Sequence, residues 1–188
     1  HADLFRRQAQ IVDTLADRQT AGQALGRELP DRVVLDLGLG DGVDSLSAVR
    51  DADITFVAVP MSACRDVLVE IATHEPPGVV AEMCSLKAHL SGIKADLRRQ
   101  GLRIVSFHPM FGPAVRMLSG RTIVFCTDAR SADLELVRNL FVDTSADLVN
   151  MEEAEHDRGM AMVLGMSHLV NLVSSRAVQL SGISADRA

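Results

Sequence analysis

The run Ile54-Thr-Phe-Val-Ala-Val-Pro60 indicates the class of fold, because it is a continuous apolar stretch with the length of a buried strand, and a proline ends it. A helix-like segment follows from about Ala63 to Ala72. Pro76-Pro77-Gly78 then introduces a second apolar run, Val79-Val-Ala-Glu-Met-Cys84. Strands that alternate with helices in this way are typical of an α/β fold with a mostly parallel sheet.

The same alternation extends in both directions from these two strands. Toward the N-terminus, Arg32-Val-Val-Leu-Asp-Leu-Gly38 predicts a strand and Asp44 to Asp53 a short helix. Toward the C-terminus the expected elements are, in order, a helix from Ala88 to Gln100, a strand from Gly101 to Phe107 that His108-Pro109 ends, a strand from Arg121 to Cys126, and a helix from its N-cap Ser131 to Phe141.

The last long segment differs from the rest of the chain. From about Ala154 to Leu180 the sequence predicts a helix with apolar residues on nearly every side. Such a helix needs a partner, either another subunit or part of a second domain. One sheet domain can cover only one side of it, so we expect an obligate homodimer that packs through this helix.

The amino-acid composition argues against several classes of function. The 188 residues are 47% apolar and 23% charged, Phe is the one aromatic type present, and the net charge is −6, which opposes binding to nucleic acid. The three cysteines are widely spaced, which suggests reduced thiols and no metal site. No stretch has the 18 or more uninterrupted apolar residues of a membrane span, and no signal-peptide core is visible. We therefore expect a soluble, cytoplasmic protein.

Candidate site residues come directly after the predicted strands, where ligands bind in open α/β sheets. These positions are Pro60, the segment Cys84-Ser85-Leu86-Lys87 and the segment His108-Pro-Met-Phe-Gly-Pro113. Together they would place a hydroxyl, an ammonium group and an imidazole along one sheet edge, which suits proton transfer beside a bound anion. Any one of them can also be an ordinary loop or capping residue.

The segment His108-Pro-Met-Phe-Gly-Pro113 followed by Gly120-Arg121 resembles the catalytic segment of prephenate dehydrogenases, enzymes of tyrosine biosynthesis. Cys84-Ser-Leu-Lys87 is similar to the family's serine-x-lysine turn, and Val57-Ala-Val-Pro60 to the strand end beneath its cofactor. Glu155-His-Asp-Arg-Gly-Met-Ala161, with Ser167-His168, resembles the opening of its helical dimerisation domain. The resemblance implies a Rossmann-like, dinucleotide-binding domain over 1–150 and the start of an all-α dimerisation domain over 151–188.

The resemblance also implies roles for individual residues. His108 would accept a proton from the substrate, and Ser85 would hydrogen-bond either His108 or the substrate hydroxyl. Lys87 would support the turn or meet an anionic substrate. His168 would face the substrate, although a hydrogen-bonded histidine in a dimer core explains it too. Val59 and Pro60 would lie against the cofactor.

The implied cofactor is NAD. Asp36, at the end of its strand, would accept hydrogen bonds from the adenosine ribose and repel a 2′-phosphate, which favours NAD over NADP. Gly22 and Gly26 are the candidate phosphate-binding glycines, but Ala21-Gly-Gln-Ala-Leu-Gly-Arg27 lacks the first glycine of the family pattern and is one residue too long between its glycines. An arginine that binds the substrate carboxylate in the family would lie beyond Ala188.

The predicted activity is the NAD-dependent oxidative decarboxylation of prephenate, or a close analogue, to a 4-hydroxyphenylpyruvate-type product. An arogenate or 4-amino-4-deoxyprephenate dehydrogenase would use the same base, and the irregular glycine loop leaves open a non-catalytic homologue. A further alternative is an S-adenosylmethionine methyltransferase, since Val34-Leu-Asp-Leu-Gly-Leu-Gly-Asp-Gly42 resembles the first motif of those enzymes. The acidic residue that they carry at the end of the next strand is missing from Ile54–Pro60.

Overall fold

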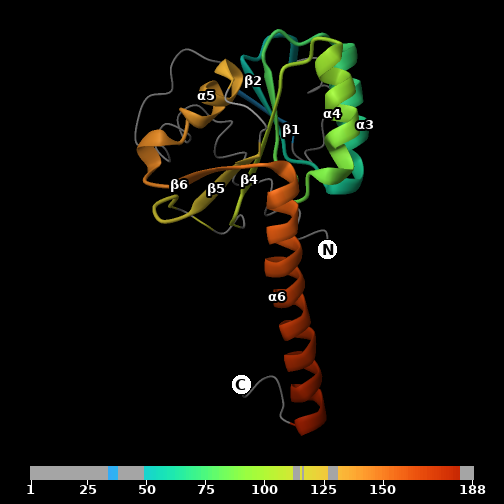
Figure 1. The fold of residues 1–188 in the computed structure, drawn as a ribbon, viewed down its shortest axis with the longest axis vertical. Helices are drawn as coiled ribbons and strands as arrows, with labels where there is room; N and C mark the ends of the chain where they lie inside the picture. Colours follow the sequence, from blue (N-terminus) through green and yellow to red (C-terminus); the bar gives the residue numbers. More distant parts are fainter. Residues whose placement is uncertain (1–33, 38–48, 112–114, 116, 127–130, 183–188) are drawn as a thin grey trace.

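The computed structural model describes residues 34–37, 49–111, 115, 117–126 and 131–182 (Figure 1). In these residues, six strands form one sheet in which each strand lies beside the next one in sequence. The strands are β1 Val34–Leu37, β2 Ile54–Val57, β3 Val79–Glu82, β4 Ile104–Pro109, β5 Thr122–Cys126 and β6 Asp147–Met151. The helices are α3 Met61–Thr73, α4 Ala88–Arg99, α5 Ala132–Arg138 and α6 Glu153–Ser181, with a short 3-10 turn at Val142–Thr144.

The direction of the strands confirms the prediction of an α/β fold with a mostly parallel sheet. β1 to β4 run parallel, β5 is antiparallel to β4, and β6 is again parallel to β5. Because parallel neighbours need a crossover connection, α3 and α4 follow β2 and β3 and lie together on one face of the sheet (Figure 1). α5 lies on the other face.

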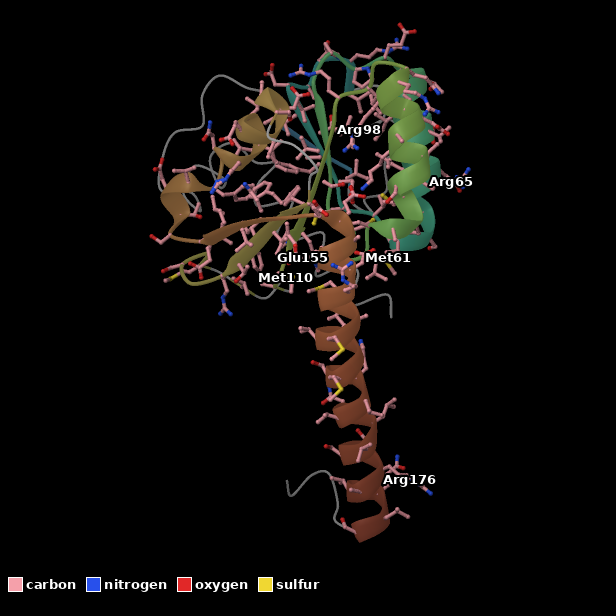
Figure 2. All side chains as sticks on the ribbon, viewed as in Figure 1. Met61, Arg65, Arg98, Met110, Glu155 and Arg176 are labelled. Atoms are coloured by element: carbon pink, nitrogen blue, oxygen red, sulfur yellow. The ribbon has the colours of Figure 1, made fainter. Side chains whose placement is uncertain are left out.

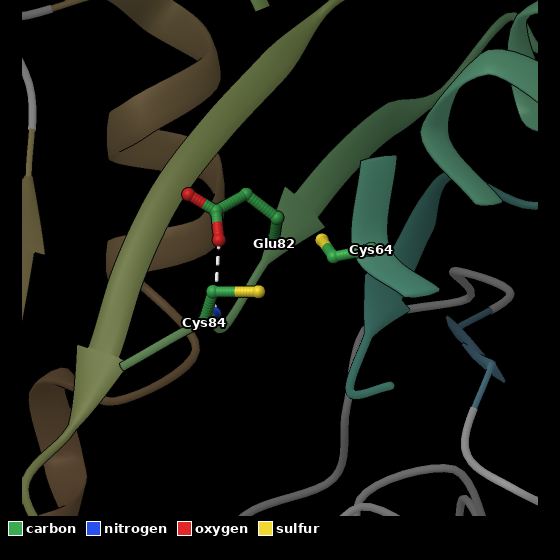
Figure 3. Close-up of side chains that lie close together, drawn as sticks. All are labelled: Cys64, Glu82 and Cys84. Atoms are coloured by element: carbon green, nitrogen blue, oxygen red, sulfur yellow. Dashed lines mark hydrogen bonds between the residues drawn. The ribbon is translucent and has the colours of Figure 1, made fainter. Parts of the chain in front are cut away.

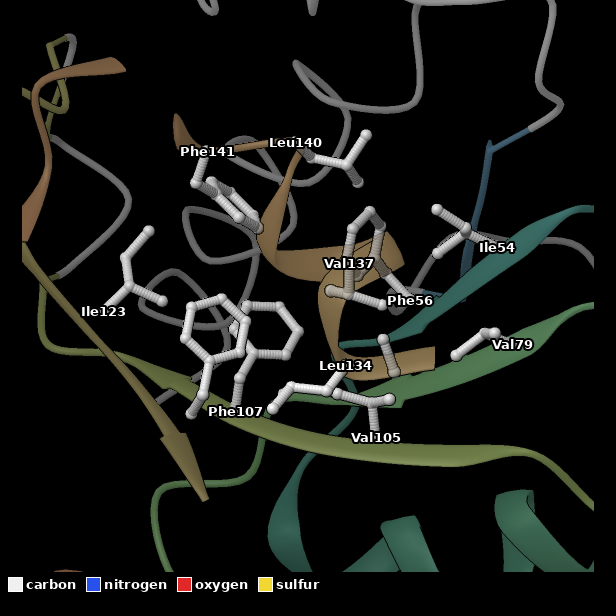
Figure 4. Packing of buried hydrophobic residues seen from close by; sticks show 12 residues of the cluster. Ile54, Phe56, Val79, Val105, Phe107, Ile123, Leu134, Val137, Leu140 and Phe141 are labelled. Atoms are coloured by element: carbon white, nitrogen blue, oxygen red, sulfur yellow. The ribbon is translucent and has the colours of Figure 1, made fainter. Parts of the chain in front are cut away.

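Both faces of the sheet are buried, which explains why its central strands are continuously apolar. β2 and β3 are buried at every position. On the α5 face, Phe107 stacks on Phe125 and meets the edge of Phe56, each with ring centroids 5.7 Å apart (Figure 4). The α3 and α4 face holds a second cluster that includes Val57, Leu68, Ile71, Val80, Leu90, Leu97 and Ile104.

Local signals in the sequence place two of these elements. The hydroxyl of Ser131 accepts a hydrogen bond from the Leu134 N–H at 3.1 Å, which confirms Ser131 as the N-cap of α5. Gly78 lets the chain pass close to β2 before β3 begins: the Val79 N–H donates to the Asp53 carbonyl at 2.9 Å, and a Cβ at Gly78 would lie 2.1 Å from the Ala52 carbonyl oxygen.

The predicted end of the fourth strand is wrong. We expected His108-Pro109 to break the strand, but β4 continues through both residues because they pair with β5, His108 with Val124 and Pro109 with Ile123. Proline is tolerated there because β3 pairs with β4 only as far as Ser106, so Pro109 has a neighbouring strand on one side only, as in an edge strand. Residues 44–48 of the helix predicted over Asp44 to Asp53 lie outside the described residues, as do Gly22 and Gly26.

The long C-terminal helix is confirmed, but most of it leaves the sheet domain. Of its residues, only His156 and Met160 are buried, and beyond them α6 projects away from the sheet (Figure 1). Beyond Met160 its large apolar residues are exposed, among them Val163, Leu164, Met166, Leu169, Leu172 and Val173. By length and composition alone α6 could also cross a membrane, with a mean hydropathy of 1.2 in its most apolar window.

Candidate functional site

The candidate site lies at the carboxyl edge of the parallel strands. Four elements meet there: the end of β4, the starts of α3 and α4, and α6 where it leaves the sheet. Figure 2 shows Met61 at the start of α3, Met110 just after β4 and Glu155 in the first turn of α6 at this edge. His108 is the penultimate residue of β4, so the strand itself carries the imidazole to this edge. The edge is the usual position of a ligand site in an open α/β sheet.

Three side chains at this edge form a continuous series of contacts. Nδ1 of His108 lies 3.0 Å from Nε2 of His156, and Nδ1 of His156 lies 2.9 Å from Oδ1 of Asp157. The two imidazole rings are nearly perpendicular, at 80°, with centroids 5.1 Å apart. Since His156 and Asp157 belong to α6, the first turn of that helix completes a group that begins in β4.

Asp157 also binds the start of α4. Its carboxylate accepts hydrogen bonds from the Lys87 N–H at 2.9 and 3.0 Å and from the Ala88 N–H at 2.7 Å. Burial by itself would raise the pKa of Asp157, but the two amides and His156 outweigh it and hold that pKa below its usual value. The Asp157 side chain is therefore an anion with a fixed orientation at neutral pH.

His108 is neutral in this environment. Its side chain is buried, and burial is the main cause that lowers its pKa to about 4, followed by the positive charge of Lys87 and the proximity of His156. The carboxylates of Glu82 and Asp157 act in the opposite direction and are outweighed. A neutral imidazole can accept a proton from a ligand.

A buried ionic cluster lies directly behind the histidine. Nζ of Lys87 lies 3.2 and 3.1 Å from the two carboxylate oxygens of Glu82 and donates to the Phe107 carbonyl at 2.8 Å. Nζ of Lys94 lies 3.2 Å from Glu82 and donates to the Ser106 hydroxyl at 2.7 Å. Glu153 from α6 pairs with Lys94, and the Ser106 hydroxyl donates to Glu82.

The charges in this cluster explain how a glutamate can sit inside the sheet. Burial would raise the pKa of Glu82, but the ammonium groups of Lys87 and Lys94, the Ser106 hydroxyl and the Cys84 N–H together lower it. Glu82, Lys87 and Lys94 are all fully buried. A buried carboxylate is tolerated only when it is paired and hydrogen-bonded in this way.

Two roles were expected for Lys87, support of the turn or contact with an anionic substrate. Its ammonium group is fully buried and bound to Glu82 and to the Phe107 carbonyl, contacts that fit support of the turn after β3. Ser85 lies half-buried in the same turn. Among the described residues, the hydrogen-bond partner of His108 is His156, not Ser85, which leaves the substrate hydroxyl as the partner predicted for Ser85.

Of the remaining predicted site residues, some lie near the edge that holds His108 and one lies far from it. Val59 and Pro60 lie half-buried at the end of β2, and Asp36 lies in β1, where its backbone pairs with Phe56. His168 is exposed on the projecting part of α6, 12 residues or about 18 Å beyond His156 along the helix. In a single chain, therefore, His168 does not reach the edge that holds His108.

The thiols of Cys64 and Cys84 and the carboxylate of Glu82 form a second group, with their ligand atoms within 4.8 Å of one another (Figure 3). The Cys84 N–H donates to Glu82 at 2.9 Å. Hydrogen bonding to Cys84, with burial second, raises the pKa of the Cys64 thiol. A cation here would have to compete with two lysines for Glu82 and find deprotonated thiols, so the donor set does not fit a metal.

Sequence reasoning did not identify Glu82, Lys94, Glu153 or His156 as members of the site. A weak signal exists for two of them. Glu82 interrupts an otherwise apolar strand, and Lys94 falls seven residues after Lys87, which places both lysines on one side of α4. A charged residue inside a buried strand requires a partner, and the two lysines are the nearest candidates in sequence.

Comparisons with known proteins agree with this geometry. Residues 27–150 match the family model of the prephenate dehydrogenase nucleotide-binding domain. The "probable arogenate/prephenate dehydrogenase" of Methanocaldococcus jannaschii is 26% identical over 137 residues, which cover 71% of this chain and 31% of that protein. The T-protein of Enterobacter agglomerans is 20% identical over 139 residues, 74% of this chain and 37% of that protein. The chain thus spans about a third of the length of these curated relatives.

Solved structures show the same fold. Prephenate dehydrogenase from Aquifex aeolicus, in complex with hydroxyphenyl propionate and NAD+, superimposes with a TM-score of 0.64 at 16% identity, covering 94% of this chain and 67% of that one. An imine reductase variant from Myxococcus stipitatus, in complex with NAD+, gives a TM-score of 0.60 at 15% identity and covers 95% and 66% of the two chains. The fold is therefore shared by dehydrogenases and reductases.

Proposed function

The chain belongs to the prephenate dehydrogenase family, and from this premise we propose that it catalyses the NAD-dependent oxidative decarboxylation of prephenate or a close analogue. The observation that supports this most directly is a neutral histidine, His108, held at the carboxyl edge of the sheet by His156. The family match also excludes the methyltransferase alternative, because residues 27–150 include the whole glycine-rich segment on which that alternative rested.

In the proposed reaction, His108 is the group that accepts a proton from the substrate. A bound nicotinamide would supply the hydride acceptor for the substrate carbon that carries the ring hydroxyl. The imidazole of His108 takes the hydroxyl proton at the same time, so that a carbonyl forms. Loss of the ring carboxylate as carbon dioxide then returns its bonding electrons to the ring, which becomes aromatic. Ser85, in the turn after β3, would hydrogen-bond the substrate hydroxyl beside His108.

The residues at the sheet edge fit a dinucleotide. β1, β2 and β3 are parallel and end together, which brings Asp36, Val59 with Pro60, and Ser85 to one edge of the sheet. Asp36 would bind the adenosine ribose and select NAD over NADP. Val59 and Pro60 offer half-buried apolar surface against which the cofactor would pack.

Calorimetric titration of the 188-residue chain with NAD and with NADP tests the cofactor. We expect micromolar binding of NAD and weaker binding of NADP. A strong preference for NADP would contradict the role of Asp36. No heat and no thermal shift at millimolar NAD would instead favour a homologue that does not bind the cofactor.

The substrate is tested by following NADH formation with prephenate, arogenate and 4-amino-4-deoxyprephenate. We propose prephenate as the substrate. All three compounds would use His108 as the base, so the base does not distinguish them, and the rate measured with each compound decides. A chain that binds NAD but oxidises none of them would contradict the proposed reaction while leaving the nucleotide-binding domain in place.

We propose that a second copy of the chain covers α6. The helix exposes apolar residues around its whole circumference, more than one neighbouring face can bury, and an identical helix offers a matching surface. Arg176 is also exposed on α6, and a charged residue of this kind is costly inside a lipid bilayer. In such a dimer, His168 of each copy would lie in the helical layer next to the substrate groove.

We also propose that the protein works in the cytoplasm. Cys64, Cys84 and Cys126 are free and buried. Burial raises the pKa of the Cys126 thiol to about 12, so this thiol stays protonated at neutral pH. Fractionation of cells that produce the protein, followed by immunoblotting, tests the location, and recovery in the membrane fraction would contradict it.

A further inference from the structure

We propose that His156 and Asp157 are positioning residues that determine which nitrogen of His108 carries its proton, so that Nε2 is the proton-accepting atom. The role in catalysis rests on the proposed function, but the position of the proton itself does not. The geometry that carries the inference is the unbroken series of contacts from Asp157 through His156 to His108.

The direction of each hydrogen bond follows from its neighbour. Asp157 is an anion and can only accept, so Nδ1 of His156 must be the donor in the 2.9 Å contact. With one ring proton, held on Nδ1, His156 has none on Nε2, which makes Nε2 the acceptor in the 3.0 Å contact with His108. His108 therefore carries its proton on Nδ1. Its Nε2 keeps a free electron pair, and no described residue engages it.

The backbone of α4 fixes the starting point of this series. The N–H groups of Lys87 and Ala88 both point at the Asp157 carboxylate, so its orientation and its negative charge are set by the helix N-terminus. A carboxylate in water could rotate or leave its histidine partner. Here it would have to break three hydrogen bonds at once to do so.

A doubly protonated His156 would give the opposite result, which makes the proposal testable. An imidazolium at this position would donate from both nitrogens, so His108 would accept at Nδ1 and carry its own proton on Nε2.

The charged and titratable groups around His108 come from three elements. They are Glu82 in β3, Lys87 at the start of α4, and His156 and Asp157 in α6. Glu82 and Lys87 neutralise each other in a contact of 3.1 Å. The contacts of His156 with Asp157 and His108 are consequently the ones that set the position of the proton on His108.

Nuclear magnetic resonance of the chain labelled with 15N-histidine measures this directly, because the chemical shift of each imidazole nitrogen reports whether it is protonated. Signals are assigned with His108→Asn and His156→Gln. We expect His108 at pH 7 to carry its proton on Nδ1, the opposite of the form that free histidine favours. A wild-type spectrum with the proton on Nε2 would overturn the proposal, and this readout does not require the chain to be active.

Asp157→Asn tests the origin of the effect. In this variant the amide oxygen can replace Oδ2 and still accept from Ala88 and Lys87, while the amide nitrogen replaces Oδ1 and donates to His156. The two hydrogen bonds made by His156, one to residue 157 and one to His108, then reverse, and His108 should carry its proton on Nε2. An unchanged His108 spectrum in the folded variant would overturn the proposal. If the variant does not fold, His156→Gln and the wild-type spectrum decide the question.

Steady-state kinetics test whether the position of the proton on His108 affects catalysis. With the substrate that the chain oxidises, Asp157→Asn should lower kcat by roughly 10²–10⁴ with little change in KM, because the proton-accepting atom is blocked while binding is kept. His156→Gln keeps a carbonyl acceptor for His108 and should retain more activity. His89→Gln, an exposed histidine on α4, is the matched control and should leave both the spectrum and kcat unchanged. Equal kcat in Asp157→Asn and wild type would contradict the catalytic part alone.

Discussion

Nζ of Lys94 in α4 lies 3.2 Å from Oε1 of Glu82 in β3, and both side chains are fully buried. Lys87 approaches the same carboxylate at 3.1 Å, and Glu153 from α6 pairs with Lys94. Two carboxylates and two ammonium groups thus neutralise one another beneath the histidine. The balance matters because removal of a single member leaves a buried charge without compensation.

Glu82→Gln should lower the free energy of unfolding by about 3–5 kcal/mol, since two buried lysines lose their shared counter-charge. Urea unfolding followed by circular dichroism measures the change. Glu70→Gln, at an exposed position on α3, is the matched control and should change stability by no more than about 0.5 kcal/mol. Equal effects of the two substitutions would contradict the role of the cluster.

The stability of the wild-type chain should fall in acid for the same reason. The pKa of Glu82 is lower in the folded protein than its ordinary value of about 4.3, so its contribution is complete above that value and is lost as the pH falls through the folded pKa. Unfolding free energies measured from pH 6 down to pH 3 should therefore decrease with a shallower slope in Glu82→Gln. Parallel curves for the two proteins would contradict this prediction.

Gly78→Ala should destabilise the sheet by about 1–3 kcal/mol, because the new Cβ would lie 2.1 Å from the Ala52 carbonyl oxygen and the backbone would have to move. Gly92→Ala is the matched comparison. A Cβ at Gly92 meets nothing within 4 Å, and alanine is the better residue inside helix α4, so this change should stabilise the protein by roughly 0.5–1 kcal/mol. Thermal melts should show shifts of opposite sign.

His108→Asn should reduce turnover by roughly 10²–10⁴, because asparagine keeps a hydrogen-bonding side chain but cannot accept the proton. NADH formation under saturating substrate measures the loss. NAD binding should be retained, since His108 is assigned to the substrate. Unchanged turnover in the variant would remove His108 from the mechanism.

Leu164→Glu combined with Leu172→Glu should convert the dimer to monomers or to aggregates, since two charges would enter the apolar interface between helices. Sedimentation velocity at micromolar concentration measures the state. Gln179→Glu, a polar position on the same helix, should leave the dimer intact. A wild-type chain that sediments as a compact monomer would contradict the homodimer and indicate that α6 folds against another part of its own protein.

The elements of the fold were predictable because their signals are local. Apolar runs of strand length predicted β2, β3 and β5, and Ser131 marked the start of α5. β6 was missed, because Asp147–Met151 lies at the sheet edge with no fully buried position and has no continuous apolar run. The continuation of β4 through Pro109 depends on pairing with β5, which local sequence does not show.

The site was predictable only where one residue type indicates chemistry by itself. His108 was identified by its place after a strand and by the motif around it. His156 and Asp157 looked like ordinary first-turn residues of a helix, since an acidic residue there is favourable in any helix. Their partners His108, Lys87 and Ala88 lie 48 to 70 residues earlier in the chain, and only the tertiary fold brings them together.

The dependence of His108 on the first turn of α6 has a consequence for protein engineering. The family match ends at residue 150, whereas His156 and Asp157 follow it. A chimera that joins this sheet to a foreign helical region at that boundary would separate the histidine from the two residues that orient it. Recombination of such proteins should therefore transfer the sheet together with the helical turn that ends at Met160, and place the junction after it.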